Sequence, residues 1–378
     1  MVLAGCCLVS IGIQSFVIAP SSIAPLLVEQ FTLSRAETGN IVSAVMLGMI
    51  LVQLPSGYLL DRFDNRWLVI PGVALYIAIV VAIQFVDSYG QFLQLRVLGG
   101  VAGGIVFTAG ANVVAQVFVD GKQSFATGLY LASPPMGWAI AHTTSPAIGT
   151  AYGPLSVFLL HGLVAFVGVA LFWIAADRPI RSEGSPTVGE FVRAFGNRSI
   201  LLVSVSAFSL YSLYLFLNSW LPTYGTEVLS LPLATAGIAT AIVPIVGIFA
   251  RPAGGWLSGF LGGRHRFVLL TGLSLGFVFL VATPFASYLP LFLLLITGAA
   301  FSIQLGTGVY YVLTRELATP GTEGTSLAVL TSISWTGSLT APIAGGWLVA
   351  TYSWMAAFAV FGVVALVGII ALLPLPAK

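Results

Sequence analysis

Apolar residues gather along this chain in long runs, and short polar connections separate the runs. A helix that crosses a bilayer needs about 20 mostly apolar residues, and each run is long enough to supply one. We predict twelve membrane-spanning helices, over residues 2–28, 38–60, 67–86, 89–117, 123–148, 153–176, 200–225, 233–260, 267–286, 288–314, 323–349 and 353–375. The first run lacks a basic start and is longer than the apolar core of a signal peptide, so we expect a retained helix.

The composition changes this picture little. The chain has 378 residues, of which 58% are hydrophobic and 7% are charged, whereas a soluble domain carries about 25% charged residues. A net charge of +2 without a clustered basic face argues against nucleic-acid binding. Cys6 and Cys7 are adjacent in an apolar run, which excludes a CxxC redox or zinc pair. The sequence therefore predicts an all-α integral membrane protein.

The basic residues predict the orientation of the helices. With twelve helices and a cytoplasmic N-terminus, eleven of the 14 Lys and Arg residues fall on one side and Arg35 alone falls on the other. Arg96 and Arg251 lie inside predicted helices. Because Lys and Arg concentrate on the cytoplasmic side, we expect both termini in the cytoplasm and a location in the cell membrane.

The only long polar connection, residues 178–199, divides the chain into a first six-helix bundle (1–177) and a second one (200–378). Thr187 and Glu190 have the spacing of a capping box, so we expect a short amphipathic helix on the cytoplasmic surface there. The segment Gly57–Asp61 followed by Arg66 recurs 198 positions later as Gly255–Gly259 followed by Arg264. Such internal repeats are typical of secondary transporters, whose substrate site lies between the halves. The alternative is coincidence in a glycine-rich chain.

One segment also resembles a known motif. Gly57-Tyr-Leu-Leu-Asp61-Arg62-Phe-Asp64-Asn65-Arg66 is similar to the loop between helices 2 and 3 of the major facilitator superfamily, with departures at Asp64 and Asn65. Gly128 and Gly137 resemble the first half of an antiporter pattern of that family, but Ala141-His142 stands where its second half has Gly-Pro. A match to that second half, Gly337 followed by Ala341-Pro342, lies on helix 11 instead. The resemblance implies two pseudo-symmetric six-helix bundles that rock against each other. It also implies gating roles for Gly57, Asp61, Arg62, Arg66, Gly137 and Pro342, although the loop cluster could instead be a solvated turn.

The buried charges bear on the substrate. All twelve acidic residues fall in connections or near helix ends, whereas Arg96 and Arg251 lie deep in their helices. A charge at the bilayer centre costs about 2.5–3.5 kcal/mol or more, so each arginine needs water, hydrogen bonds or an anion. Ala250-Arg251-Pro252 resembles the helix-8 arginine of small-anion carriers of this superfamily. Gly247 stands where monocarboxylate carriers have an aspartate, and Gln53 where nitrate carriers have a second arginine. A structural role is the alternative for both arginines.

Other polar residues fall on helices that line the cavity in this superfamily. We predict contributions to substrate binding from Gln14, Gln53, Arg96, Tyr211, Tyr214, Asn218, Arg251, Gln304 and Tyr310, with Asn112 a further cavity candidate. His142 and His161 are the histidines at depth, and His142 is the candidate for proton coupling. The alternatives are interfacial anchoring for the tyrosines and a plain hydrogen-bonding role for the histidines.

These observations predict a secondary active or facilitative transporter that moves a small organic or inorganic anion by alternating access. The alternative in the same superfamily is a carrier of sugars or lipophilic drugs, and a non-transporting receptor comes last. The sequence has no GxxxxGK loop, no clustered metal ligands and no credible Ser-His-Asp set, so we expect neither an enzyme nor a cofactor. The expected partners are the substrate, a co-transported proton or exchanged anion, and the lipid bilayer, with a monomer as the working unit.

Overall fold

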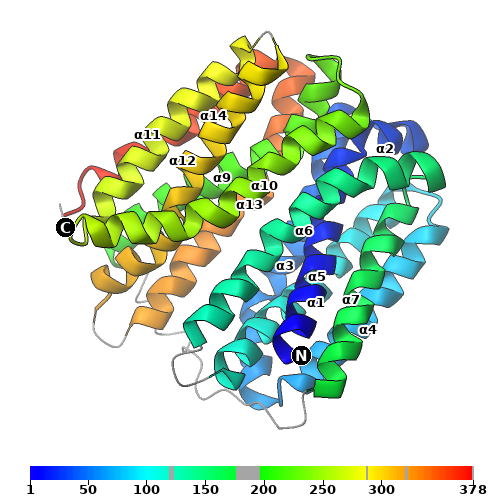
Figure 1. The fold of residues 1–378 in the computed structure, drawn as a ribbon, viewed down its shortest axis with the longest axis horizontal. Coiled ribbons are helices and arrows are strands. Elements are labelled where there is room, and N and C mark those ends of the chain that lie inside the picture. Colours follow the sequence, from blue (N-terminus) through cyan, green and yellow to red (C-terminus); the bar gives the residue numbers. More distant parts are fainter. Residues whose placement is uncertain (119–122, 176–195, 287, 320–321, 377–378) are drawn as a thin grey trace. The chain divides into compact units, whose positions relative to one another are not determined.

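The computed structural model describes residues 1–118, 123–175, 196–286, 288–319 and 322–376, apart from the side chains of residues 54, 57, 58, 60–62, 123 and 124. The regular structure of these residues is helical (Figure 1). Twelve of the described helices have at least 17 residues: α1 (Val2–Ser22), α3 (Arg35–Arg62), α4 (Arg66–Ala82), α5 (Tyr89–Val117), α6 (Gln123–Tyr152), α7 (Ser156–Ala175), α9 (Arg198–Glu227), α10 (Leu233–Phe260), α11 (His265–Ala282), α12 (Leu289–Leu317), α13 (Glu323–Thr351) and α14 (Trp354–Leu372). The shorter elements are α2 (Ala24–Phe31), η1 (Ile83–Phe85) and η2 (Thr283–Phe285).

Among the described residues, 11 helices are long and apolar enough to cross a membrane. The long helix outside that set is α6, which carries Pro134, Pro135 and Pro146 together with several hydroxyl side chains. With 30 residues it is nevertheless as long as α9 and one residue longer than α5. The predicted spans and these helices agree to within a few residues at most ends.

The first predicted span is the exception, because the structure does not continue it as one helix to residue 28. α1 ends at Ser22, Ile23 has φ −120° and ψ 18°, and α2 begins at Ala24 with a proline in its first turn. Pro25 has no N–H to continue the α1 hydrogen-bond ladder, although it fits the start of a new helix. The proline therefore divides the apolar run.

The residues form two compact units, each with most of its contacts within itself. One contains Met1–Ser185 with Leu233–Ala241, and the other contains Pro186–Pro232 with Ile242–Lys378. In the first unit α1 packs against α6 and α7, and α3 packs against α5; in the second, α9 packs against α13 and α14, and α11 against α12 (Figure 1). We expected an amphipathic helix within 178–199. Residues 178–195 of that segment are outside the described part of the structure.

The two units repeat the same internal packing. The ring of Phe16 meets Phe158 edge-on at 5.6 Å, and Phe216 meets Phe358 edge-on at 5.3 Å. The helix contacts repeat as well. A Cβ atom on Gly137 would lie 2.6 Å from the Ile11 oxygen, and one on Gly337 would lie 2.5 Å from the Phe208 oxygen. In both units a glycine thus permits the close approach of two long helices.

Candidate functional site

Arg251 in the second unit is the centre of the polar cluster best suited to bind a ligand. It lies on α10 just before Pro252, and its side chain is partly buried. With the Gln304 amide oriented to satisfy its neighbours, Oε1 accepts hydrogen bonds from Arg251 Nε at 3.1 Å and from Nη2 at 2.9 Å. In this orientation the amide nitrogen donates to Thr307 Oγ1 at 3.1 Å. The guanidinium is therefore held by a neutral partner on α12.

Three tyrosines surround this pair. The Arg251 Cζ atom lies 5.8 Å from the centre of the Tyr214 ring, within the range of a cation–π interaction. The hydroxyl oxygens of Tyr211 on α9 and Tyr311 on α12 lie 3.4 Å apart. Tyr311 lies seven residues, about two helical turns, after Gln304 on α12, so the two residues share a face of that helix. The cluster thus combines one cation with phenol groups that can donate hydrogen bonds.

The structure separates two adjacent tyrosines. Tyr310 was a predicted binding residue, and it is almost fully buried, with its hydroxyl sharing a hydrogen bond of 2.6 Å with Ser206 Oγ. Tyr311, which sequence reasoning missed, has its hydroxyl beside that of Tyr211. The sequence signal for Tyr311 was its place directly after Tyr310. Only the rotation of α12 about its axis shows which of the two tyrosines joins the cluster.

Asn218 is fully buried and lies one turn beyond Tyr214 on α9. Its Nδ2 atom donates to the main-chain oxygen of Tyr214 at 2.8 Å. Asn218 therefore stabilises the helix turn that carries Tyr214. Arg251, Gln304, Tyr214 and Tyr211 are thus the predicted residues that the structure brings together.

The charge of this cluster is not balanced by nearby acidic residues in the sequence. No Asp or Glu occurs between Glu227 and Glu316, a stretch that includes all of α10 and α11 and most of α12. Gln304 accepts hydrogen bonds without bringing a negative charge. An anion with oxygen acceptors is the ligand that this arrangement suits best.

Arg96 has a different environment in the first unit. Its side chain is fully buried, and it donates through Nε to the Ile41 oxygen at 3.2 Å, through Nη2 to the Val17 oxygen at 2.8 Å, and through Nη1 to the Phe16 oxygen. Its Cζ atom also lies 4.4 Å from the centre of the Phe16 ring. These contacts join α5 to α1 and α3, so the geometry favours the structural alternative for Arg96.

The remaining predicted residues of the first unit are buried or half-buried. Gln14 Oε1 accepts a hydrogen bond from Trp138 Nε1 at 3.0 Å, and Gln53 is half-buried on α3. His142 is fully buried, with Nδ1 2.6 Å from Ser22 Oγ. The hydrogen bond ties α6 to the end of α1, which agrees with the hydrogen-bonding alternative for this histidine and leaves its coupling role a prediction.

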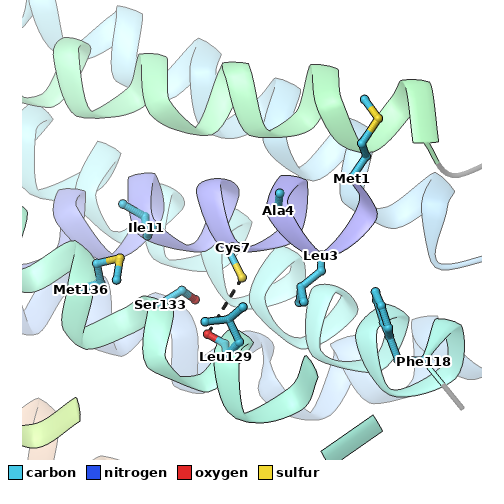
Figure 2. Close-up of a pocket in the computed structure, with 9 residues that line it drawn as sticks. All are labelled: Met1, Leu3, Ala4, Cys7, Ile11, Phe118, Leu129, Ser133 and Met136. Carbon is cyan, nitrogen blue, oxygen red and sulfur yellow. Dashed lines mark hydrogen bonds between the residues drawn. The ribbon is translucent and has the colours of Figure 1, made fainter. Parts of the chain in front are cut away.

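A pocket of about 420 Å³ also opens in the first unit, between α1 and α6 (Figure 2). Its lining is mostly apolar and consists of Met1, Leu3, Ala4, Cys7, Ile11, Phe118, Leu129, Ser133 and Met136. Cys7 is a free thiol whose Sγ lies 4.0 Å from the Leu129 oxygen. No group of three or more His, Cys, Asp or Glu that could hold a metal occurs among the described residues.

The motif between helices 2 and 3 is described in part. Arg66 forms an ion pair of 2.7 Å with Asp64, one of the two residues that depart from the family motif. The predicted gating positions 57, 61 and 62 lie in α3, but their side chains are outside the described part of the structure.

Predicted gating residues Gly137 and Pro342 lie where helices meet. Ser15 Oγ donates to the Gly137 oxygen at 2.8 Å, and Trp220 Nε1 donates to the Pro342 oxygen at 3.0 Å.

The repeated motif of the second unit contains a hydrogen-bond network that the sequence did not predict. Ser258 Oγ lies 2.6 Å from His265 Nδ1, and His265 Nε2 lies 3.0 Å from Glu316 Oε1. These residues come from α10, α11 and α12, so the network connects one end of three helices. The sequence signal was Ser258 within the repeated segment, next to the glycine-rich turn before His265.

Comparison with known proteins agrees with this architecture. The family model of the Major Facilitator Superfamily matches residues 4–308. The chain is 27% identical over 255 residues to a probable nitrate/nitrite transporter, NarK2, of Mycobacterium tuberculosis, covering 64% of this chain and 62% of that protein. It is 22% identical to the hexuronate transporter of Bacillus subtilis, covering 88% of this chain and 83% of that protein.

A solved structure shows the same fold. A bacterial homolog of the human lysosomal transporter Spinster, in an inward-facing and unoccupied conformation, superimposes with a TM-score of 0.80 at 16% identity, over 98% of this chain and 94% of that one. The predicted all-α membrane fold of the superfamily is thereby confirmed. With the family model matching most of its length, the chain belongs to the Major Facilitator Superfamily of membrane transporters.

Proposed function

We propose that this transporter carries a small organic or inorganic anion and that Arg251 supplies the charge that binds it. The observation behind this proposal is the cluster in the second unit, where a partly buried guanidinium is held by the neutral amide of Gln304 at 2.9 and 3.1 Å. Phenol hydroxyls from Tyr211 and Tyr311 lie nearby and can add hydrogen bonds to a bound anion. The second deep arginine, Arg96, is fully buried against main-chain oxygens and is not part of the proposed site.

The relatives support the same substrate class. One is described as a probable nitrate/nitrite transporter and another as a hexuronate transporter. Nitrate, nitrite and hexuronates differ in size, but each carries one negative charge that is shared between oxygen atoms. Such groups accept paired hydrogen bonds from a guanidinium.

Transport in this proposal proceeds by alternating access of the two six-helix halves, without a chemical step on the substrate. The cluster of Gly57, Asp61, Arg62 and Arg66 forms one gate, and the close helix contacts at Gly137 and Pro342 allow the halves to rock. The protein works as a monomer in the cell membrane with both termini in the cytoplasm. A co-transported proton, carried by His142, or an exchanged anion drives accumulation.

The test is uptake into liposomes that contain the purified protein. The panel contains nitrate, nitrite, glucuronate and lactate as anions, glucose as a neutral solute, and a lipophilic cationic dye. We expect saturable uptake of at least one anion by the wild type and its loss in Arg251→Gln. Arg251→Lys serves as the matched variant because it keeps the charge and loses the two-pronged geometry, so it should retain part of the uptake.

The alternative function has its own outcome in this experiment. Saturable uptake of glucose or the dye, with no anion uptake, would favour the carrier of neutral or lipophilic solutes. Anion uptake that is unchanged in Arg251→Gln, with both proteins equally folded by size-exclusion chromatography, would remove Arg251 from the binding site.

A further inference from the structure

The Gln304 amide occupies one particular edge of the Arg251 guanidinium. A guanidinium has five N–H donors, and Gln304 Oε1 accepts from those on Nε and Nη2. The edge formed by Nη1 and Nη2 is a different one, and it is suited to bind a carboxylate or nitrate group with two parallel hydrogen bonds. The amide can therefore fix the plane of the guanidinium while a small anion binds at the neighbouring edge.

Gly247, one turn before Arg251 on α10, makes room for this amide. With the amide oriented in this way, a Cβ atom at Gly247 would lie 2.8 Å from the Gln304 oxygen that accepts from Arg251 and 3.5 Å from Gln304 Cγ. Any larger side chain at position 247 would therefore push the amide away. Gln304 is itself buried, with 1% of its surface exposed, so it has little freedom to move aside. Position 247, where an acidic partner for Arg251 on the same helix would stand, thus has no side chain. The Gln304 amide from α12 fills the space.

The presence of an amide rather than a carboxylate beside Arg251 changes the charge of the site. A carboxylate at this position would form an ion pair with Arg251 and cancel its charge, so that an anion could bind only after the carboxylate took up a proton. An amide offers the same oxygen acceptor and brings no charge of its own, so the charge of Arg251 is not cancelled. The sequence between Glu227 and Glu316 contains no acidic residue that could restore the balance.

We propose that Gln304, in the space left by Gly247, is a specificity-determining residue that keeps Arg251 cationic and oriented for a singly charged oxyanion or carboxylate. This inference rests on the proposed function, because it explains how the same site selects its substrate. Its consequence is that anion binding at Arg251 needs no proton on a neighbouring acid. A neutral solute gains nothing from this arrangement, and a dianion would remain unbalanced by one charge.

The decisive variant is Gln304→Glu, which places a carboxylate where the amide is. At pH 7.5 we expect the KM for nitrate or glucuronate to rise about tenfold or more, because the new ion pair cancels the charge of Arg251. As the pH falls towards 5, the ratio of this KM to that of the wild type should decrease, because the protonated acid again offers a neutral oxygen.

In the described part of the second unit, few other groups near residue 304 titrate. The charged group at the site is Arg251 on α10, and the titratable groups are the tyrosines Tyr211, Tyr214, Tyr310 and Tyr311 on α9 and α12. His265, Arg266 and Glu316 lie at one end of α11 and α12, about 18 Å along the helix from Gln304. The ordinary pKa of a tyrosine, about 10, lies well above the pH range of this experiment.

Two further variants test the positioning role without adding charge. Gly247→Ala should displace the amide, and Gln304→Met should remove its acceptor; both should raise KM a few-fold at every pH. Gly259→Ala is the matched control on α10, since its Cβ would have no atom within 4 Å, and it should leave KM unchanged.

The outcomes separate the two proposals. If the wild type takes up none of the anions, the proposed function fails and this inference fails with it. If the wild type carries an anion and folded Gln304→Glu has the wild-type KM across this pH range, the inference alone is overturned. If Gln304→Glu does not fold, a wild-type KM in both Gly247→Ala and Gln304→Met overturns the inference.

Discussion

Arg96 donates a hydrogen bond to the main-chain oxygen of Phe16, and this is the oxygen to which Pro20 cannot donate. In a regular α-helix the N–H of residue 20 would bind the carbonyl of residue 16, but proline has no N–H. Arg96 on α5, which lies 76 positions after Pro20 in the sequence, supplies the missing donor. The missing N–H of Pro20 thus accounts for one of the three main-chain oxygens to which Arg96 donates.

The first prediction concerns the stability that this contact gives. Arg96→Leu removes three hydrogen bonds to main-chain oxygens. At roughly 0.6 kcal/mol for a hydrogen bond between membrane helices, the free energy of unfolding should fall by about 2 kcal/mol. Unfolding by SDS titration measures it, with exposed Arg198→Gln as the control that should change little. Unchanged stability in Arg96→Leu would mean that water satisfies these oxygens equally well.

The second prediction joins Arg96 to Pro20. Pro20→Ala restores a helical donor to the Phe16 oxygen, so the loss of Arg96 should cost less in that background. The expected difference is about one hydrogen bond, or roughly 0.6 kcal/mol. A double-mutant cycle of the two substitutions gives this coupling energy directly. Strictly additive effects would show that Arg96 does not replace the donor that the proline lacks.

A feature can be predicted from the sequence when the residues that determine it are close together in the chain. Apolar runs set the helices, because each run is a local property of the chain. The roles of the two deep arginines depend on partners far away in sequence, namely Phe16 for Arg96 and Gln304 for Arg251. No local pattern distinguishes a guanidinium that binds carbonyl oxygens from one that a single amide holds. The choice between Tyr310 and Tyr311 depends in the same way on the rotation of α12.

The third prediction uses the repeated glycine contacts. Gly137→Ala and Gly337→Ala each place a Cβ within 2.6 Å of a main-chain oxygen, so the paired helices must separate. The free energy of unfolding should fall by about 1–3 kcal/mol in each case. Gly128→Ala, on the same helix as Gly137, meets no atom within 4 Å and should leave stability unchanged or slightly raised. A large effect in only one half would show that the two contacts are not equivalent.

The last prediction separates the two adjacent tyrosines of α12. Tyr310→Phe removes the hydroxyl that shares a buried hydrogen bond with Ser206, so it should lower stability by about 1 kcal/mol and leave KM unchanged. Tyr311→Phe removes the hydroxyl beside Tyr211, near Arg251, so it should raise the KM for the transported anion about two- to fivefold with little effect on stability. Both variants lose a single oxygen atom at neighbouring positions, so each serves as the control for the other. Anion uptake and SDS unfolding of the same preparations measure both quantities, and the reverse assignment would place Tyr310 rather than Tyr311 in the binding site.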